Sequence, residues 1–241
     1  MEAFFKSGYF TALLIVFDVV AVIAVICITY RWLFKRIFDF LVSIVCIAAL
    51  SPLYIAVAVC GNKAKKRGEI DSLFQTEAYV GKKEKRVVLH TFATQNAQGE
   101  RGAYGEWLKN TGIDKTARMF DLFLGRVSLI GITPISRGDH VFLEEENKGR
   151  YIAKIGLIHP LVLGGNREID YDTLLHSENK YAWTFSFFGD CRIFFAWLLK
   201  KIRGESKEYM GKTTEQTYAE WLRENGKITD ADLAAAKEAE L

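Results

Sequence analysis

The apolar residues of this chain are concentrated in its first 60 positions. Residues 37–60 read IFDFLVSIVCIAALSPLYIAVAVC, with Asp39 as the one charged side chain. As a helix this segment would extend about 36 Å, enough to cross a bilayer. Pro52 removes a backbone donor and clashes with the preceding turn, so we expect the helix to kink or break at Ser51-Pro52. Ser51 can supply a local hydrogen bond to the backbone that the proline leaves unpaired.

Basic residues flank this segment on both sides. Arg31, Lys35 and Arg36 precede it, and the stretch 63–67 that follows carries three lysines and an arginine. A straight transmembrane helix would place one basic cluster on each side of the membrane, which the positive-inside bias disfavours. We therefore expect residues 31–62 to form a re-entrant membrane helix that enters, bends and returns. The alternative is an ordinary kinked transmembrane helix.

A second apolar run covers residues 9–29 and predicts a transmembrane helix within residues 1–30. Because Arg31 follows this run, we expect the N-terminus outside and Arg31 in the cytoplasm. Asp18 interrupts the run, and a charged carboxylate inside a membrane is costly, so we expect Asp18 either to face protein, such as the 37–60 helix, or to be protonated. Basic clusters beside apolar segments favour an anionic membrane surface. No nucleic-acid recognition motif accompanies them, so we expect no nucleic-acid partner.

Beyond residue 63 the pattern is typical of an ordinary soluble domain. Two β-rich runs joined by a glycine-lysine turn predict a hairpin over residues 73–92. A short helix is expected near residues 104–110. A second helix is expected from Lys115 to Leu124, with Asp114 at its N-cap.

The second half of this region alternates short apolar and charged segments. Residues 127–135 indicate a short strand or turn, and residues 138–153 a charged helix. Residues 186–202 combine an apolar stripe with basic side chains, which suits a helix in the membrane interface. A helix facing the core of the soluble domain is an equally good interpretation of this stripe.

The tail from residue 204 to residue 241 is polar. Thr213-x-x-Gln216 and Thr229-x-x-Asp232 resemble capping boxes and predict two short helices that begin at these motifs. We expect the tail to bind a partner or to act only as a solubilising appendage.

Composition adds little chemistry to this picture. The 241 residues carry a formal net charge of +3, and 50% of them are hydrophobic. Neither a P-loop nor a Gly-x-Ser-x-Gly motif is present. The cysteines have no metal-ligand or redox spacing and are expected to be plain thiols. They are Cys27, Cys46, Cys60 and Cys191.

Several short motifs follow one another between residues 32 and 203. They are Lys35-Arg36-Ile37-Phe38-Asp39, Ser51-Pro52, Val80-Gly81, Phe92-x-Thr94, Thr111-x-x-Asp114, Ser128-Leu129-Ile130-Gly131 with Pro134, and Ser186-x-x-x-Asp190-x-x-Ile193. In this order the chain resembles the bacterial sugar transferase family, the monotopic polyprenyl-phosphate phosphoglycosyl transferases.

The resemblance implies an α+β membrane-associated fold. We expect a transmembrane helix at 1–30, a re-entrant helix at 31–62 that is broken at Ser51-Pro52, and a cytosolic domain at 63–203, followed by the helical tail. The cytosolic domain is expected to be small and mainly helical, with a short β-hairpin and interfacial amphipathic helices.

The resemblance also implies an activity. Family members transfer a sugar-1-phosphate from a nucleotide sugar to polyprenyl phosphate at the cytoplasmic face of the bacterial inner membrane, in the assembly of exopolysaccharide, capsule, O-antigen or glycoprotein. They use an aspartate nucleophile, a covalent phosphosugar and Mg²⁺. Asp114 matches that nucleophile and is the expected metal ligand. Alternatively, Asp114 only caps a helix.

The charged positions of the family pattern are mostly replaced. Lys115 stands where the family has a glutamate, and Ala93 and Thr133 stand where it has arginines; two more arginines are absent from residues 75–81. Losing one donor aimed at developing charge costs about 10²–10³ in rate. We therefore expect catalysis to be impaired or lost. The alternative function is a non-catalytic partner or scaffold of an active glycan-assembly enzyme, such as a second sugar transferase.

Other cations are candidates to replace the missing ones in substrate binding. Adjacent residues on a helix do not share a face, so we expect Lys115 not to reach the place where Asp114 points, whereas Arg118 lies one turn further on. The candidates are Lys115, Arg118, Arg126, Arg137 and Arg167.

Overall fold

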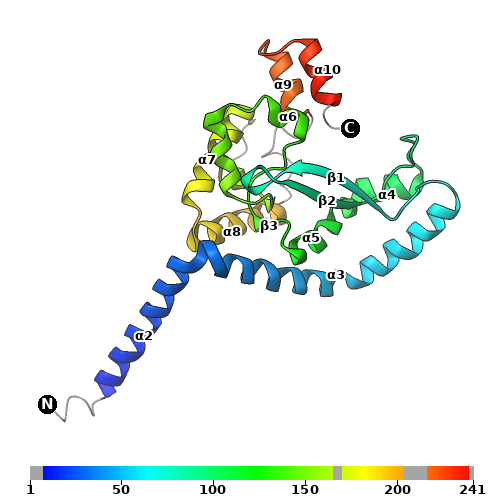
Figure 1. The fold of residues 1–241 in the computed structure, drawn as a ribbon. Coiled ribbons are helices and arrows are strands. Elements are labelled where there is room, and N and C mark those ends of the chain that lie inside the picture. Colours follow the sequence, from blue (N-terminus) through cyan, green and yellow to red (C-terminus); the bar gives the residue numbers. More distant parts are fainter. Residues whose placement is uncertain (1–7, 165–169, 204–215, 239–241) are drawn as a thin grey trace.

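A long helix lies under a small α+β domain, and a second helix projects away from it (Figure 1). The computed structural model describes residues 8–164, 170–203 and 216–238. The projecting helix is α2 (Gly8–Thr29), which passes through the π-helical turn η1 (Tyr30–Phe34) into the long helix α3 (Lys35–Lys66).

Helix α3 runs through Pro52 without interruption, so the prediction of a broken helix is wrong. The helix bends instead, and its two halves point in different directions in Figure 1. Pro52 has no N–H to donate to the carbonyl of Ala48, four residues earlier. The hydroxyl of Ser51 donates to that carbonyl at 2.8 Å. The expected local partner is therefore present, and it keeps the backbone helical across the proline.

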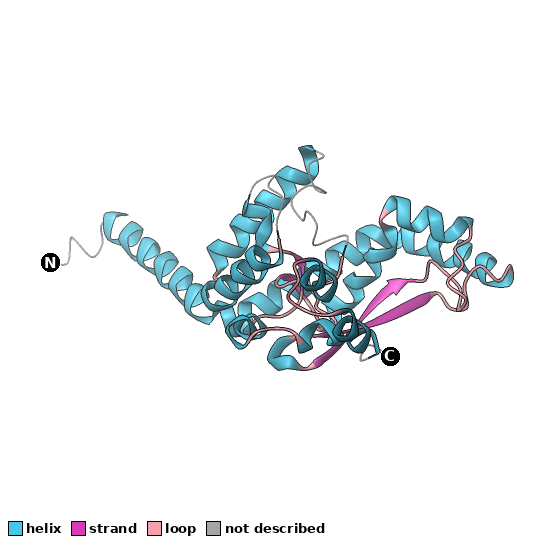
Figure 2. Ribbon diagram, turned by 90° about the horizontal axis from the view of Figure 1, so that it is seen from above, coloured by secondary structure: helices cyan, strands magenta, loops and turns pink. Residues whose placement is uncertain are grey.

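The predicted hairpin is confirmed. Strands β1 (Phe74–Val80) and β2 (Arg86–Phe92) pair antiparallel, and η2 (Lys82–Glu84) forms the turn between them. Figure 2 shows these two strands surrounded by helices.

Two short helices follow the hairpin, as the sequence predicts. Helix α4 (Ala103–Thr111) ends at Gly112, whose φ of 70° reverses the chain. The chain then enters the 3₁₀ turn η3 (Ile113–Ala117) directly, and α5 (Arg118–Leu124) continues it. Asp114 is therefore the second residue of η3 and not an N-cap, because Gly112 already occupies that position.

Both ends of α3 pack against this domain. Near its start, Arg36 donates to the last carbonyls of α5 at 2.9 and 3.0 Å. In its second half, the hydroxyl of Tyr54 donates to the carbonyl of Thr116 in η3 at 3.0 Å. Val57 and Ala64 are buried in one cluster with Tyr104 of α4. The two halves of the bent helix therefore hold the same folded unit.

A second, parallel pair of strands joins distant parts of the chain. Strand β3 (Ser128–Ile130) lies in the predicted strand or turn, and its partner is β4 (Gly156–Ile158). Just after β3, Gly131 faces Gly156 so closely that a Cβ on Gly131 would lie 2.8 Å from the Gly156 nitrogen. Only glycine permits this approach of two backbones.

The single charged helix expected over 138–153 is in fact two shorter elements. Helix α6 (Arg137–Val141) is followed by the 3₁₀ segment η4 (Glu145–Ile152), with Glu144 in an extended conformation between them. Leu143 is buried in the core at this point. Glu144 itself is exposed, and its extended backbone separates the two elements.

The remaining helices complete the domain. After η5 (Pro160–Gly164), helix α7 (Tyr171–Thr184), which the sequence pattern did not reveal, crosses to α8 (Phe187–Arg203). The α8 range agrees with the helix expected at 186–202. Its residue Asp190 is buried and accepts hydrogen bonds from Tyr30 at 2.6 Å and Tyr181 at 2.9 Å. Asp190 therefore ties the junction of α2 and α3 to the domain.

The described part of the tail packs against the domain and is not a free appendage. Helix α9 (Tyr218–Glu224) begins with a capping box of Thr217 and Glu220. Its Ala219 N–H donates to Asp139 of α6 at 2.8 Å, and Trp221 is buried. Helix α10 (Asp230–Glu238) begins at the predicted box of Thr229 and Asp232. The expectation that a helix begins at the Thr213-x-x-Gln216 motif is wrong, because Gln216 lies before α9 and is not helical; Thr213 itself lies outside the described residues.

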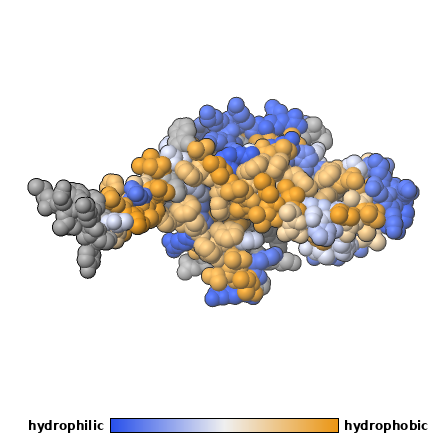
Figure 3. Space-filling view, turned by 90° about the horizontal axis from the view of Figure 1, so that it is seen from below, coloured by the Kyte–Doolittle hydropathy of each residue, from blue (hydrophilic) through white to orange (hydrophobic). Residues whose placement is uncertain are grey.

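A continuous apolar surface runs along the underside of the molecule (Figure 3). Helix α3 is long and apolar enough to cross a membrane, and α2 contains a shorter apolar stretch, Thr11–Val25. Asp18 is exposed on α2 and does not pack against the 37–60 helix or another described part of this chain, contrary to the first of the two expectations. Side chains of α2, α3 and α8 contribute large exposed apolar area, among them Phe17, Leu41, Val45, Phe188, Phe195 and Ile202. An exposed apolar surface of this extent is typical of a membrane or protein contact.

Candidate active site

Asp114 lies at the wall of a polar pocket. The residue is 4% exposed and belongs to η3, which Gly112 and the Tyr54 hydrogen bond fix in place. The pocket has a volume of about 300 Å³ between the hairpin, η3 and the loop that precedes α4. It is lined by Gln75, Glu77, Tyr79, Thr91, Phe92, Thr94, Gln95, Arg101, Lys109, Asp114, Lys115 and Arg118.

Positive charge exceeds negative charge in this pocket. The four cations Arg101, Lys109, Lys115 and Arg118 face two carboxylates. The nitrogen of Lys109 lies 3.6 Å from an Asp114 oxygen. Two positive charges are left over, and they favour an anionic ligand such as a diphosphate.

The second carboxylate, Glu77, is engaged from two sides. The hydroxyl of Tyr79 donates to Glu77 at 2.7 Å, and a guanidinium nitrogen of Arg118 lies 3.7 Å from the same carboxylate oxygen. Burial raises the pKa of Tyr79 above its ordinary value, and the neighbouring Glu77 carboxylate raises it further. The Tyr79 hydroxyl therefore stays protonated at neutral pH. The Nε of Arg118 is buried without a hydrogen-bond partner among the described residues. Arg118 therefore retains a donor that an oxygen ligand can use.

A neighbouring pocket of about 260 Å³ shares Tyr79, Lys115 and Arg118 with the first. His159 lines it, and burial lowers the pKa of His159 to about 4, so the imidazole is neutral at neutral pH. Its Nδ1 lies 3.4 Å from the carbonyl of Gly131. The two pockets together form an elongated site with the shared cations between its two parts.

The structure brings together three of the residues that the sequence singled out. Asp114, Lys115 and Arg118 line one pocket. Lys115 and Asp114 border the same cavity, so a ligand bound there can contact both, although adjacent residues of η3 point in different directions.

The other candidates lie elsewhere. Arg126 donates to Asp121 at 2.9 Å, in a cluster with His90, and is not among the lining residues. Arg137 begins α6 and is exposed. Arg167 lies outside the described residues.

Sequence reasoning missed two of the four cations of the pocket. Arg101 belongs to a glycine-containing loop whose path only the fold defines. Lys109 precedes Asp114 by five residues in the preceding helix, and the reversal at Gly112 brings the two together. Glycine after a short helix was a usable signal for that reversal.

Two carboxylates line the pocket, a number that suits a magnesium ion bound together with a phosphate ligand. Among the residues described, no group of three His, Cys, Asp or Glu side chains could hold a metal ion. Mg²⁺ commonly uses one or two carboxylates together with substrate phosphates and water. Asp114 and Glu77 supply that number of carboxylates at one pocket.

Comparison with known proteins assigns the chain to a family. The model of the family described as bacterial sugar transferase matches residues 30–204, so this chain belongs to that family. The match covers α3, the hairpin, the Asp114 pocket and α8.

Three relatives resemble the chain over 67% of its length. An uncharacterized sugar transferase of Haemophilus influenzae is 26% identical, and an undecaprenyl-phosphate galactose phosphotransferase of Salmonella typhimurium is 22% identical. The exopolysaccharide production protein ExoY of Sinorhizobium fredii is 21% identical. The aligned region spans 39% of each of the first two relatives and 82% of the third.

Proposed function

We propose that this protein transfers a sugar-1-phosphate from a nucleotide sugar to polyprenyl phosphate during polysaccharide assembly, with Asp114 as the nucleophile. The observation that carries this proposal is a buried carboxylate in a pocket with four cations. Membership of the sugar transferase family supports it, as do the names of the Salmonella and Sinorhizobium relatives.

The reaction would proceed in two displacements at one phosphorus. A carboxylate oxygen of Asp114 attacks the phosphorus that carries the sugar, and the bond to the nucleoside monophosphate breaks, so that group leaves with the electron pair. An oxygen of polyprenyl phosphate then attacks the same phosphorus and displaces the Asp114 carboxylate. The product is a polyprenyl diphosphate sugar, and the carboxylate is regenerated.

The cations of the pocket have distinct tasks in this scheme. Lys109, beside Asp114, stabilises negative charge that develops on the attacked phosphoryl group. Lys115 and Arg118 border both pockets and would hold the diphosphate between them. Mg²⁺, held by Asp114 and Glu77 together with the phosphates, would supply further charge neutralisation.

Helix α3 would lie in one leaflet as a re-entrant helix, with the domain on the cytoplasmic face of the inner membrane. One folded unit cannot occupy both sides of a bilayer, and both halves of α3 pack on the same unit through Arg36 and Tyr54. The bend at Pro52 and the basic residues at both ends support the same arrangement. The exposed apolar side of α8 would rest in the interface.

A non-catalytic partner role is the second candidate. The observation that favours it is Lys115, which borders the pocket where the family has a glutamate. A lysine there cannot ligate a metal in place of a carboxylate.

A transfer assay separates the two functions. The full chain in detergent micelles is incubated with undecaprenyl phosphate, Mg²⁺ and a panel of radiolabelled UDP-sugars. The proposal predicts label in the lipid fraction and stoichiometric release of UMP. Asp114→Asn should abolish both, whereas Glu106→Gln, an exposed residue of α4 outside the pocket lining, should not. A folded wild-type chain that transfers none of the sugars would favour the partner role.

A further inference from the structure

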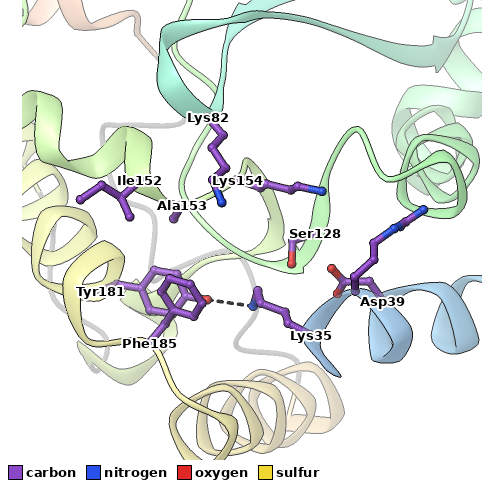
Figure 4. Close-up of a pocket in the computed structure, with 10 residues that line it drawn as sticks. Lys35, Asp39, Lys82, Ser128, Ile152, Ala153, Lys154, Tyr181 and Phe185 are labelled. Carbon is purple, nitrogen blue, oxygen red and sulfur yellow. Dashed lines mark hydrogen bonds between the residues drawn. The ribbon is translucent and has the colours of Figure 1, made fainter. Parts of the chain in front are cut away.

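A second positively charged pocket lies beside the N-terminal end of α3 (Figure 4). Its volume is about 190 Å³, and no lining residue is shared with the Asp114 pocket. The polar side chains that line it are Lys35, Arg36, Asp39, Lys82, Ser128, Lys154 and Tyr181. The four cations come from three separate parts of the chain: the start of α3, the hairpin turn and the segment before β4.

The positive charge of this pocket is only partly compensated. Lys35 pairs with Asp190, and Asp39 contributes one further carboxylate to the lining. Arg36 and Lys154 donate to backbone carbonyls at the C-terminal end of α5, at 2.8–3.0 Å. These carbonyls offset part of the positive charge through their dipoles but carry no formal negative charge. Two positive charges therefore remain after both carboxylates are counted.

The surroundings of Lys154 disfavour its charged form. Burial lowers the pKa of Lys154 below its ordinary value, and Arg36, Lys82 and Lys35 act in the same direction, with Asp39 opposing them. The fold thus holds several cations together against their mutual repulsion. A bound anion would remove that cost.

A buried hydroxyl also borders the pocket. Ser128 is fully buried beside the Asp39 carboxylate, with which it interacts, and its hydroxyl makes no hydrogen bond of ordinary geometry with the residues described. Figure 4 shows this hydroxyl at the wall of the pocket, with the Lys82 side chain reaching in from above. A buried hydroxyl without a well-formed hydrogen bond can donate to a ligand or to a water molecule.

We propose that this pocket binds a phosphate group at a site separate from that of the transfer reaction. Ammonium and guanidinium groups make strong charge-assisted hydrogen bonds to phosphate oxygens. A phosphate here would bridge α3, the hairpin turn and the β4 segment, and so fasten the long apolar helix to the domain. The phosphate comes from a lipid headgroup or from solution, and the chemistry of recognition is the same for both.

The test measures thermal unfolding of the full chain in neutral maltoside micelles. Inorganic phosphate is titrated at constant ionic strength against chloride, and phosphatidylglycerol is titrated separately in mixed micelles against phosphatidylcholine. Lys82→Gln is the test variant, because Lys82 is exposed and the change should leave the fold intact. Lys85→Gln is the matched control: it removes the same charge from the same turn but does not line the pocket. Arg101→Gln reports on binding in the Asp114 pocket.

We expect at least one of the two probes to raise the unfolding temperature saturably. Lys82→Gln should raise its half-maximal concentration about tenfold, whereas Lys85→Gln and Arg101→Gln leave it unchanged. Saturation by phosphatidylglycerol alone assigns the site to a lipid headgroup, and saturation by inorganic phosphate alone assigns it to a soluble ligand. The proposal would be overturned if neither probe gave a saturable shift in unfolding temperature. It would also be overturned if Lys82→Gln and Lys85→Gln changed the half-maximal concentration equally, or if Arg101→Gln abolished the shift.

Discussion

Lys109 and Asp114 lie on opposite sides of a chain reversal, and their charged groups are 3.6 Å apart. Gly112, with a φ of 70°, makes this reversal possible, because a residue with a Cβ would be strained there. The pairing places a cation beside the carboxylate that the family resemblance identifies as the nucleophile. This cation comes from helix α4 and is not Lys115, the residue that directly follows Asp114.

Lys109→Gln should therefore slow transfer while leaving the fold intact. The side chain is 47% exposed, so its loss opens no cavity. We expect a decrease in kcat of about tenfold to a hundredfold, because a cation beside the reacting group is lost. Steady-state kinetics with the best UDP-sugar measures this, with Lys85→Gln as the control. An unchanged kcat would show that Lys109 does not act on the reacting phosphoryl group.

Removing one member of the buried pair Arg150–Glu178 should strongly destabilise the fold, because it leaves the other charge buried without a partner. The two charged groups are 2.7 Å apart and both side chains are fully buried; Arg150 also donates to the carbonyl of Thr133 at 2.5 Å. Arg150→Met leaves Glu178 without a charge partner and should cost about 3–5 kcal/mol of unfolding free energy. Urea unfolding in micelles measures this. The double variant Arg150→Met/Glu178→Leu should lose less unfolding free energy than Arg150→Met alone. A larger loss of unfolding free energy in the double variant would contradict this explanation.

Stability should fall below neutral pH because of His159. The pKa of His159 is lowered from 6.5 to about 4 in the folded protein, so between these values the unfolded chain binds a proton that the folded chain does not. The stability contributed by neutral His159 is therefore fully present above pH 6.5 and is lost as pH falls toward 4, by up to about 3 kcal/mol.

Unfolding free energies at pH 7 and pH 5 test this prediction. His159→Asn should show a smaller loss between the two pH values than the wild type. His176→Asn, which changes an exposed histidine of α7, should behave like the wild type. Equal pH dependence of His159→Asn and the wild type would show that His159 is not the group responsible.

The membrane arrangement predicts where Lys65 lies. If α3 returns to the face from which it enters, Lys65→Cys in intact bacterial cells should resist a membrane-impermeant maleimide and react after the inner membrane is opened. Glu106→Cys, in the folded domain, should give the same result. Labelling of Lys65→Cys in intact cells above the background of the native cysteines would refute the re-entrant helix.

Local sequence signals predicted the parts of the fold that depend on local chemistry. The alternating runs of 73–92 form the hairpin, and the box at Thr229 opens α10. Elements fixed by long-range contacts were not predictable in this way. The parallel pairing of β3 with β4 joins segments that are almost 30 residues apart, and α7 carries an apolar stripe too weak to stand out.

The candidate site was predictable only in part for the same reason. Asp114, Lys115 and Arg118 are near neighbours in sequence, so a single motif located all three. Arg101 lies in a loop and lines the pocket, whereas Arg126 forms an ion pair with the buried Asp121 and does not line it. Residue type and spacing do not reveal which cation a buried carboxylate will bind, because that choice depends on packing.

The most direct test of the central claim is the mass of the intact protein after exposure to its donor. The full chain is incubated with Mg²⁺ and each UDP-sugar in the absence of polyprenyl phosphate, and the modified peptide is sequenced. The account predicts a gain of one phosphosugar on Asp114, lost on addition of undecaprenyl phosphate and absent from Asp114→Asn. A transferring enzyme that carries no adduct, or carries it on another residue, would contradict the account.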